Sequence, residues 1–154
     1  MKRKINFLDK IGSLIPGYSG YSERDSRRNC DKVLRTTITS RLRNVEKVIS
    51  RRIDQSIRDK DHDLMRKFEL CRKELNTLVS EIEYAPYGES SLFSDMQIKE
   101  DELMRIYQFD LEMVELSNLM LLEFKALLPE EMDENTRELR EKLKERNQFI
   151  RDYK

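Results

Sequence analysis

Residues 32–57 read KVLRTTITSRLRNVEKVISRRIDQSI, and this stretch decides the fold. Apolar side chains recur in it every three or four positions, the spacing that places them along one face of an α-helix. They are Leu34, Ile38, Leu42, Val45, Ile49, Ile53 and Ile57. Since the remaining positions are almost entirely polar, the sequence predicts a long helix with one narrow apolar face.

A second apolar stripe follows the first at the same period. Its alternating steps of four and three residues suit knobs-into-holes packing between helices. The stripe consists of Leu64, Phe68, Cys71, Leu75, Leu78 and Ile82. The sequence therefore predicts a second amphipathic helical segment.

The polar residues 58–63, RDKDHD, separate the two stripes and leave two arrangements open. Because Ile57 and Leu64 are one heptad apart, a continuous helix of roughly 60 residues and about 90 Å would keep both stripes on one face. A tight turn would instead fold the second stripe back onto the first. We favour this helical hairpin, because a single domain must cover its own apolar faces.

Glycine and proline are absent from 21–85, 89–128 and 130–154, and such uninterrupted stretches are typical of long helices. Ser22 followed by Asp25 resembles a capping box, which predicts that the first of these helices starts near residue 23.

The later helices differ in how much apolar surface they carry. Apolar side chains cover more than half the circumference of 96–128, as expected for a central helix. The final helix has only a thin stripe that Arg146 interrupts, which favours an outer position.

We therefore expect an all-α fold, built as an elongated helical bundle. It should contain a long helical hairpin over 23–84, a central apolar helix over 96–128 and an outer C-terminal helix over 131–152. Residues 1–22 should form an N-terminal amphipathic strap and a Pro/Gly/Tyr turn, and 23–154 the helical bundle domain.

Charge is balanced overall but unevenly placed. The 154 residues contain 30 Lys and Arg and 30 Asp and Glu, which excludes a strongly basic or acidic protein. Residues 1–60, however, hold 16 basic and 7 acidic side chains, whereas the acidic ones prevail in 61–100 and 101–154. Neutrality thus conceals a basic first helix and an acidic remainder.

The basic first helix has two interpretations. Its arginines could form a strip that binds the phosphates of nucleic acid or of anionic lipid. They could equally pack beside the acidic helices of the same chain, which is the interpretation that we favour. The residues concerned are Arg24, Arg27, Arg28, Arg35, Arg41, Arg43, Arg51 and Arg52. The chain contains no zinc-finger, RNP-type or glycine-bearing helix-turn-helix pattern that would read bases.

Residues with catalytic or metal-binding chemistry are few. His62 is the only histidine, and it lies among aspartates that resemble the start of a calcium loop. Leu64 and Leu70 occupy the glycine and final acidic positions of such a loop, so no metal site is predicted. Cys30 lies near Arg27 and Arg28, which would stabilise a thiolate, but an ordinary buried or surface role is favoured. We predict no catalytic residue, no cofactor and no enzyme.

The N-terminal segment combines cations with apolar residues and is followed by IPGYSGY, residues 15–21. Proline and two glycines favour a tight turn there, and its two tyrosines suggest that the turn is docked. Positions 24, 27, 28, 31 and 35 are spaced by three or four and share a helix side. The candidate interaction patch is Tyr18, Tyr21, Arg24, Arg27, Arg28 and Arg35. It could receive Asp110 and the 84–93 loop of the same chain, or an acidic partner.

The segment from Ile15 to Arg35, with its PGYxGYxxRxxRRxxDKxLR pattern, resembles the opening of a group of small bacterial helical proteins without an established activity. The likeness continues at Tyr84 to Phe93 and at Leu103 to Leu111, but not in the final helix. The resemblance implies an intracellular bacterial helical protein and assigns no catalytic residue.

The sequence favours a non-enzymatic interaction or scaffolding protein that acts through its helix faces, as a homo-oligomer or with a partner protein. The reason is that 96–128 carries more apolar surface than the other stripes can readily cover. The alternative is a polyanion binder that places its basic first helix on nucleic acid or an anionic membrane surface. No small-molecule substrate is predicted.

A cytoplasmic location is expected for two reasons. The apolar run after residue 4 is broken too early for a signal peptide. The longest uncharged run of the later helices, 116–122, is too short to cross a membrane.

Overall fold

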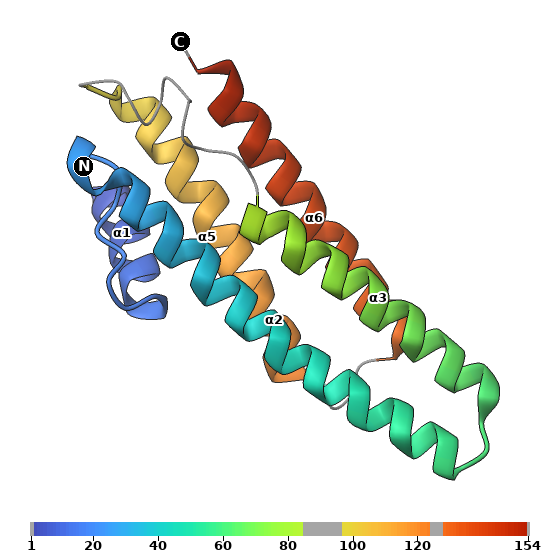
Figure 1. Cartoon of the computed structure of the whole chain (residues 1–154). Coiled ribbons are helices and arrows are strands. Elements are labelled where there is room, and N and C mark those ends of the chain that lie inside the picture. Colours follow the sequence, from blue (N-terminus) through green and yellow to red (C-terminus); the bar gives the residue numbers. More distant parts are fainter. Residues whose placement is uncertain (1, 85–96, 124–127, 154) are drawn as a thin grey trace.

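The computed structural model describes residues 2–84, 97–123 and 128–153 and is all-α, as predicted (Figure 1). Its helices are α1 (Lys2–Leu14), α2 (Arg27–Arg58), α3 (His62–Tyr84), α5 (Glu100–Glu123) and α6 (Pro129–Asp152), with a short 3-10 helix, η1 (Arg24–Ser26), before α2. None of these helices, over the residues described, is long and apolar enough to span a membrane.

Four of the helices close into a ring. Helix α2 packs on α3, α3 on α6, α6 on α5, and α5 back on α2. Figure 1 shows that α2 and α5 run in one direction and that α3 and α6 run in the other. Helix α1 lies against the outer side of α5, so that α5 has neighbours on three sides.

The predicted hairpin is confirmed, and the turn between α2 and α3 shows why the helix ends. The Asp61 amide donates to the Ser56 carbonyl at 2.9 Å, and Lys60 adopts a positive φ of 57°. This is a Schellman closure, with Lys60 at the left-handed position that glycine usually fills. The Asp61 carboxylate then accepts from the Leu64 amide at 3.1 Å, which caps the start of α3.

The predicted start of α2 at residue 23 is wrong. The regular α-helix begins at Arg27, after η1, and its N-cap residue Ser26 makes no side-chain capping hydrogen bond. The Ser22 and Asp25 pattern marks the 3-10 turn instead. Helix α5 likewise begins four residues after the predicted 96, whereas α6 begins two residues before 131 and the ends of α3 and α6, at 84 and 152, are as predicted.

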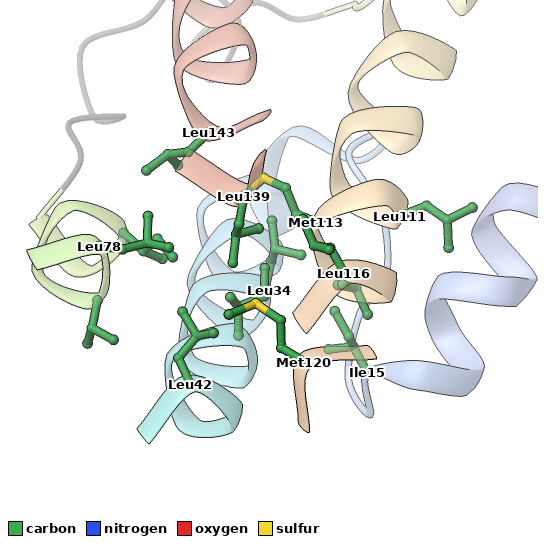
Figure 2. Close-up of a cluster of buried hydrophobic side chains, with 14 of the residues drawn as sticks. Ile15, Leu34, Leu42, Leu78, Leu111, Met113, Leu116, Met120, Leu139 and Leu143 are labelled. Atoms are coloured by element: carbon green, nitrogen blue, oxygen red, sulfur yellow. The ribbon is translucent and has the colours of Figure 1, made fainter. Parts of the chain in front are cut away.

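The core lies inside the ring of four helices. Figure 2 shows Leu34 and Leu42 of α2 meeting Met113 and Met120 of α5 in its centre. Leu139 and Leu143 of α6 close the same core and are at most 3% exposed. Helix α6 is therefore the fourth helix of the bundle, and its narrow apolar stripe is buried against the other helices of the same chain.

The strap predicted at the N-terminus belongs to this core as well. Ile11 and Ile15 are fully buried, and Leu111 on the outer side of α5 points toward α1 (Figure 2). Helix α1 thus covers an apolar face of α5 that the four-helix ring leaves outside.

Lys60→Gly tests the hairpin turn. An L-residue in the left-handed region is strained, so removing the side chain should raise the free energy of unfolding by about 0.5–1 kcal/mol. Urea denaturation measures this change. The control is Lys47→Gly on the exposed face of α2, which should lower the stability by about 1 kcal/mol. A loss of stability in both variants would contradict the assignment of the turn.

Candidate functional site: a buried tyrosine, aspartate and arginine network

Asp110, in the middle of α5, is the centre of a buried polar network. The hydroxyls of Tyr18 and Tyr21 each donate to its Oδ2 at 2.6 Å. Nε of Arg146 donates to its Oδ1 at 2.6 Å. The carboxylate is fully buried, so these three donors replace the water that it has lost.

Arg146 extends the network from α6 to α2. Its second nitrogen donates to Oδ1 of Asp31 at 2.6 Å and to the hydroxyl of Tyr21 at 2.9 Å. Asp31 also pairs with Nε of Arg35, one helical turn further along, at 2.8 Å. Arg35 in turn donates to the Ile82 carbonyl of α3 at 3.3 Å. The network therefore joins the N-terminal turn to all four helices of the ring.

The turn at residues 15–21 brings its tyrosines to Asp110 because two glycines permit the path. Gly17 and Gly20 have φ values of 88° and 90°, which other residues rarely adopt. A Cβ on Gly20 would also lie 2.6 Å from the hydroxyl oxygen of Tyr107. That hydroxyl accepts from the Tyr21 amide at 2.9 Å, so glycine is required both for conformation and for space.

Arg27, at the first position of α2, fixes the other side of the turn. Its Nε donates to the Tyr21 carbonyl at 2.8 Å, and the residue is fully buried. The rings of Tyr18 and Tyr21 meet edge to face with centroids 5.9 Å apart. The turn is thus held by hydrogen bonds at both ends and by aromatic packing between them.

Burial and charge act in opposite directions on Arg146. Burial alone lowers its pKa, but the carboxylates of Asp110 and Asp31 outweigh this effect and hold the pKa well above the usual arginine value. For Tyr18 and Tyr21, burial and the adjacent Asp110 both raise the pKa well above the usual tyrosine value. The arginine is therefore charged and the tyrosines are neutral over the physiological range.

The thiol beside this network is not activated. Burial, followed by the charge of Asp110, raises the pKa of Cys30 to about 12. The expected stabilisation of its thiolate by Arg27 and Arg28 is wrong, because Arg27 is directed at the Tyr21 carbonyl and Arg28 is exposed. Burial likewise raises the pKa of Cys71 to about 12, and its Sγ donates to the Pro129 carbonyl at 3.2 Å.

The six residues predicted to form an interaction patch separate into two groups. Tyr18, Tyr21, Arg27 and Arg35 are buried in the network, whereas Arg24 and Arg28 are exposed. The aromatic and cationic side chains are brought together as expected, but they receive Asp110 of the same chain. The 84–93 loop, the other proposed recipient, lies outside the described residues except for Tyr84.

Arg146 is the member of the network to which sequence reasoning gave no role. A signal was present, since Arg146 takes the place of an apolar residue in the stripe of α6. Asp110 occupies a comparable place in the most apolar helix. Two opposite charges at core positions of different helices indicate a buried ion pair, because neither could be buried alone.

The other candidate groups lie at the surface. His62 starts α3 and is exposed together with Asp61 and Asp63. Within the described residues there is no group of three or more His, Cys, Asp or Glu side chains suited to a metal ion. Two hollows on this surface, one between α2 and α3 and one between α3 and α6, are open grooves with charged side chains such as Arg72 and Arg140 along them.

Comparison with protein-family models, with curated proteins and with solved structures finds no match for this chain. The resemblance of residues 15–35 to small bacterial helical proteins therefore stays a prediction. Functional conclusions rest on the geometry of the molecule itself.

Arg146→Met tests the importance of the network for stability. It leaves the buried carboxylates of Asp110 and Asp31 without their shared cation, so the free energy of unfolding should fall by about 3–5 kcal/mol. Arg140→Met on the same helix is the control. Arg140 pairs with Glu74 and Glu81 but is partly exposed, so its loss should cost less than about 1 kcal/mol. Equal losses in chemical denaturation would contradict the central role of Arg146.

Alkaline titration tests the buried tyrosines. Because their folded pKa is raised, the unfolded chain loses these protons first, and stability present below about pH 10 should be lost as the pH rises further. Tyrosinate absorbance at 295 nm from Tyr18 and Tyr21 should therefore increase together with the loss of helical circular dichroism. In Tyr18→Phe the amplitude of this transition should fall by one tyrosine. Complete ionisation in an intact helical protein would refute the network.

Proposed function

We propose that this chain is a non-enzymatic interaction protein that associates with a second copy of itself through one apolar end of the bundle. The observation that carries the proposal is the distribution of exposed large hydrophobic side chains among the described residues. Five of the six lie in the half of the bundle toward the hairpin turn (Figure 1), and we call them the apolar end: Ile57, Leu70, Leu119, Leu122 and Leu128. They are between 42% and 81% exposed.

These five residues come from distant parts of the sequence and lie in the half of the bundle toward the hairpin turn (Figure 1). Ile57 lies in the last turn of α2, and Leu70 lies about two turns into α3. Leu119 and Leu122 are three residues apart near the end of α5, and Leu128 directly precedes α6. Figure 1 shows that the end of α5 and the start of α6 both lie toward the hairpin turn. The sixth exposed hydrophobic residue, Tyr84, is the last residue of α3 and lies at the other end of this helix, away from the hairpin turn.

Exposed apolar side chains concentrated in one half of the bundle support association more strongly than the same number spread over the whole surface. Fully burying one leucine is worth about 1.5–3 kcal/mol, and clustered apolar surface on a monomer commonly marks an interaction site. The apolar surface of 96–128 that the other helices leave uncovered is limited, among the described residues of α5, to its last turns, at Leu119 and Leu122. Helices α1, α2 and α6 cover the rest.

A non-enzymatic role is supported by the fact that the buried carboxylates, hydroxyls and thiol described above interact with other groups of the same chain. The buried carboxylates of Asp31 and Asp110 are bound to arginines, and the two tyrosine hydroxyls are bound to Asp110. Burial keeps the thiol of Cys30 protonated. These side chains hold the helices together and are sealed from solvent, which favours a structural role over contact with a substrate.

Leu119→Gln combined with Leu122→Gln tests the proposal. Sedimentation equilibrium of the original chain should give a mass above the monomer at micromolar concentration, and the double variant should shift toward the monomer by about tenfold in dissociation constant. Both side chains are exposed, so the thermal stability of the dilute protein should not fall.

Tyr84→Gln is the matched control, since it removes an exposed apolar side chain at the other end and should leave the mass unchanged. A monomeric mass for the original chain across the micromolar range would reject the proposal. So would an equal shift in the control variant.

A further inference from the structure

The structure divides the cations of α2 into inward and outward sets. Most of the eight arginines considered for a phosphate-binding strip contact groups of the same chain, Arg28 among them. These contacts include Arg27 with the Tyr21 carbonyl, Arg35 with Asp31, Arg41 with the Leu14 carbonyl, Arg43 with Glu83, and Arg52 over the ring of Phe68. Contacts within the chain therefore engage many of these arginines, but of the five contacts named here one, Arg43 with Glu83, is with a carboxylate of another helix.

The solvent face of α2 carries a second set of cations, which overlaps the first because Arg28 and Arg43 are exposed although each also has a partner within the chain. The exposed residues of α2 include six basic side chains, which we call the basic ridge: Arg28, Lys32, Arg43, Lys47, Arg51 and Arg58. Asp54 is the one carboxylate among the exposed residues of this helix. Most of the other exposed positions are small neutral polar residues, namely Asn29, Thr36, Ser40, Asn44 and Gln55.

The basic ridge is long, and its charges are unevenly spaced, with a gap of 11 residues between Lys32 and Arg43. Thirty residues separate Arg28 from Arg58, which corresponds to about 45 Å of straight helix at 1.5 Å per residue. Lys47 lies four residues from both Arg43 and Arg51, so these three charges follow one another on one side of α2 about 6 Å apart. A surface of this length with one dominant sign of charge suits an extended polyanion.

We propose that the basic ridge of α2 binds the phosphate backbone of nucleic acid without reading its sequence. Lysine and arginine supply the affinity by neutralising phosphates and releasing counterions. The Ser, Thr and Asn side chains between them are further donors of the kind that hydrogen-bond to phosphate oxygens.

The composition of the ridge disfavours two other occupants. A protein partner binds mainly through a few buried aromatic or aliphatic anchors, and a membrane surface needs apolar side chains that enter the lipid. Between Arg28 and Gln55 the exposed residues of α2 include no large apolar side chain, and Ile57 occurs only at the end. Nucleic acid needs no such anchor, because charge provides the affinity.

The remaining surface would restrict binding to this one face. The exposed residues of α6 include seven carboxylates and only three cations. The carboxylates are Glu130, Glu131, Glu134, Glu138, Glu141, Glu145 and Asp152. A polyanion is repelled there and attracted along α2, although the whole chain has no net charge.

The test uses the full chain and fluorescein-labelled oligonucleotides of mixed sequence, as single strands, duplexes and RNA, in anisotropy titrations at about 50 mM salt. The variant Lys32→Gln/Lys47→Gln/Arg51→Gln removes three charges of the ridge. Its affinity should fall by about tenfold or more, and the salt dependence of duplex binding should lose a log–log slope of about 3.

The matched control is Arg137→Gln/Lys144→Gln/Arg151→Gln, which removes three exposed cations of α6 and changes the net charge equally. Its affinity should stay within about twofold of the original chain, because these residues lie outside the ridge. Thermal melting followed by circular dichroism verifies that both variants fold.

Three results would overturn the proposal. They are the absence of nucleic-acid binding at about 50 mM salt, an equal loss in both triple variants, and binding to anionic phosphatidylserine vesicles without binding to nucleic acid. None depends on the apolar end, so the outcome is independent of the self-association experiment.

Discussion

The ion pair between Asp110 and Arg146 is the interaction on which the arrangement of the helices depends. Each charge is buried at a core position of its helix, and neither could be held there without the other. Arg146 also binds Asp31, and Asp110 also binds the two tyrosines of the N-terminal turn. Apolar packing alone tolerates a helix that slides or rotates by part of a turn. Charge-assisted hydrogen bonds at 2.6 Å do not, so the network selects one register of α2, α5 and α6.

The elements of the fold could be predicted because their signals are local. The stripes ending at Ile57 and beginning at Leu64 have a helical period, and the polar residues between them supply the Asp61 cap. The start of α2 was misplaced because a capping pattern at Ser22 and Asp25 is equally compatible with a 3-10 turn. The network was beyond local reasoning, since the partners that Asp110 and Arg146 bind are 36 to 125 residues away and their pairing follows from how the helices pack. Only the anomaly of charged residues within apolar stripes could have indicated it.

The basic residues of α2 lie in two environments, buried and exposed, and only the fold shows which residue lies in which. The side of the helix on which a residue lies decides its environment. Residues that face α3, α5 or the N-terminal turn contact carboxylates, carbonyls or a ring. Arg35 is therefore a structural cation, whereas Lys32, three residues earlier, is exposed. The net charge and the number of arginines add the buried and the exposed residues together. Neither therefore describes the electrostatic potential at the surface of the protein. That potential depends on the exposed set alone, which is basic on α2 and acidic on α6.

The two proposed surfaces meet at the hairpin turn, where Ile57 of the apolar end directly precedes Arg58 of the basic ridge. This adjacency couples them physically. Association of two copies through their apolar ends would join two ridges in one assembly, and a polyanion bound to the first would then meet the second at a high effective concentration. Because the buried network fixes the register of α2 against α5 and α6, the angle between the ridges would be defined. The rigid buried network would thereby determine how the two basic ridges are oriented toward a bound polyanion.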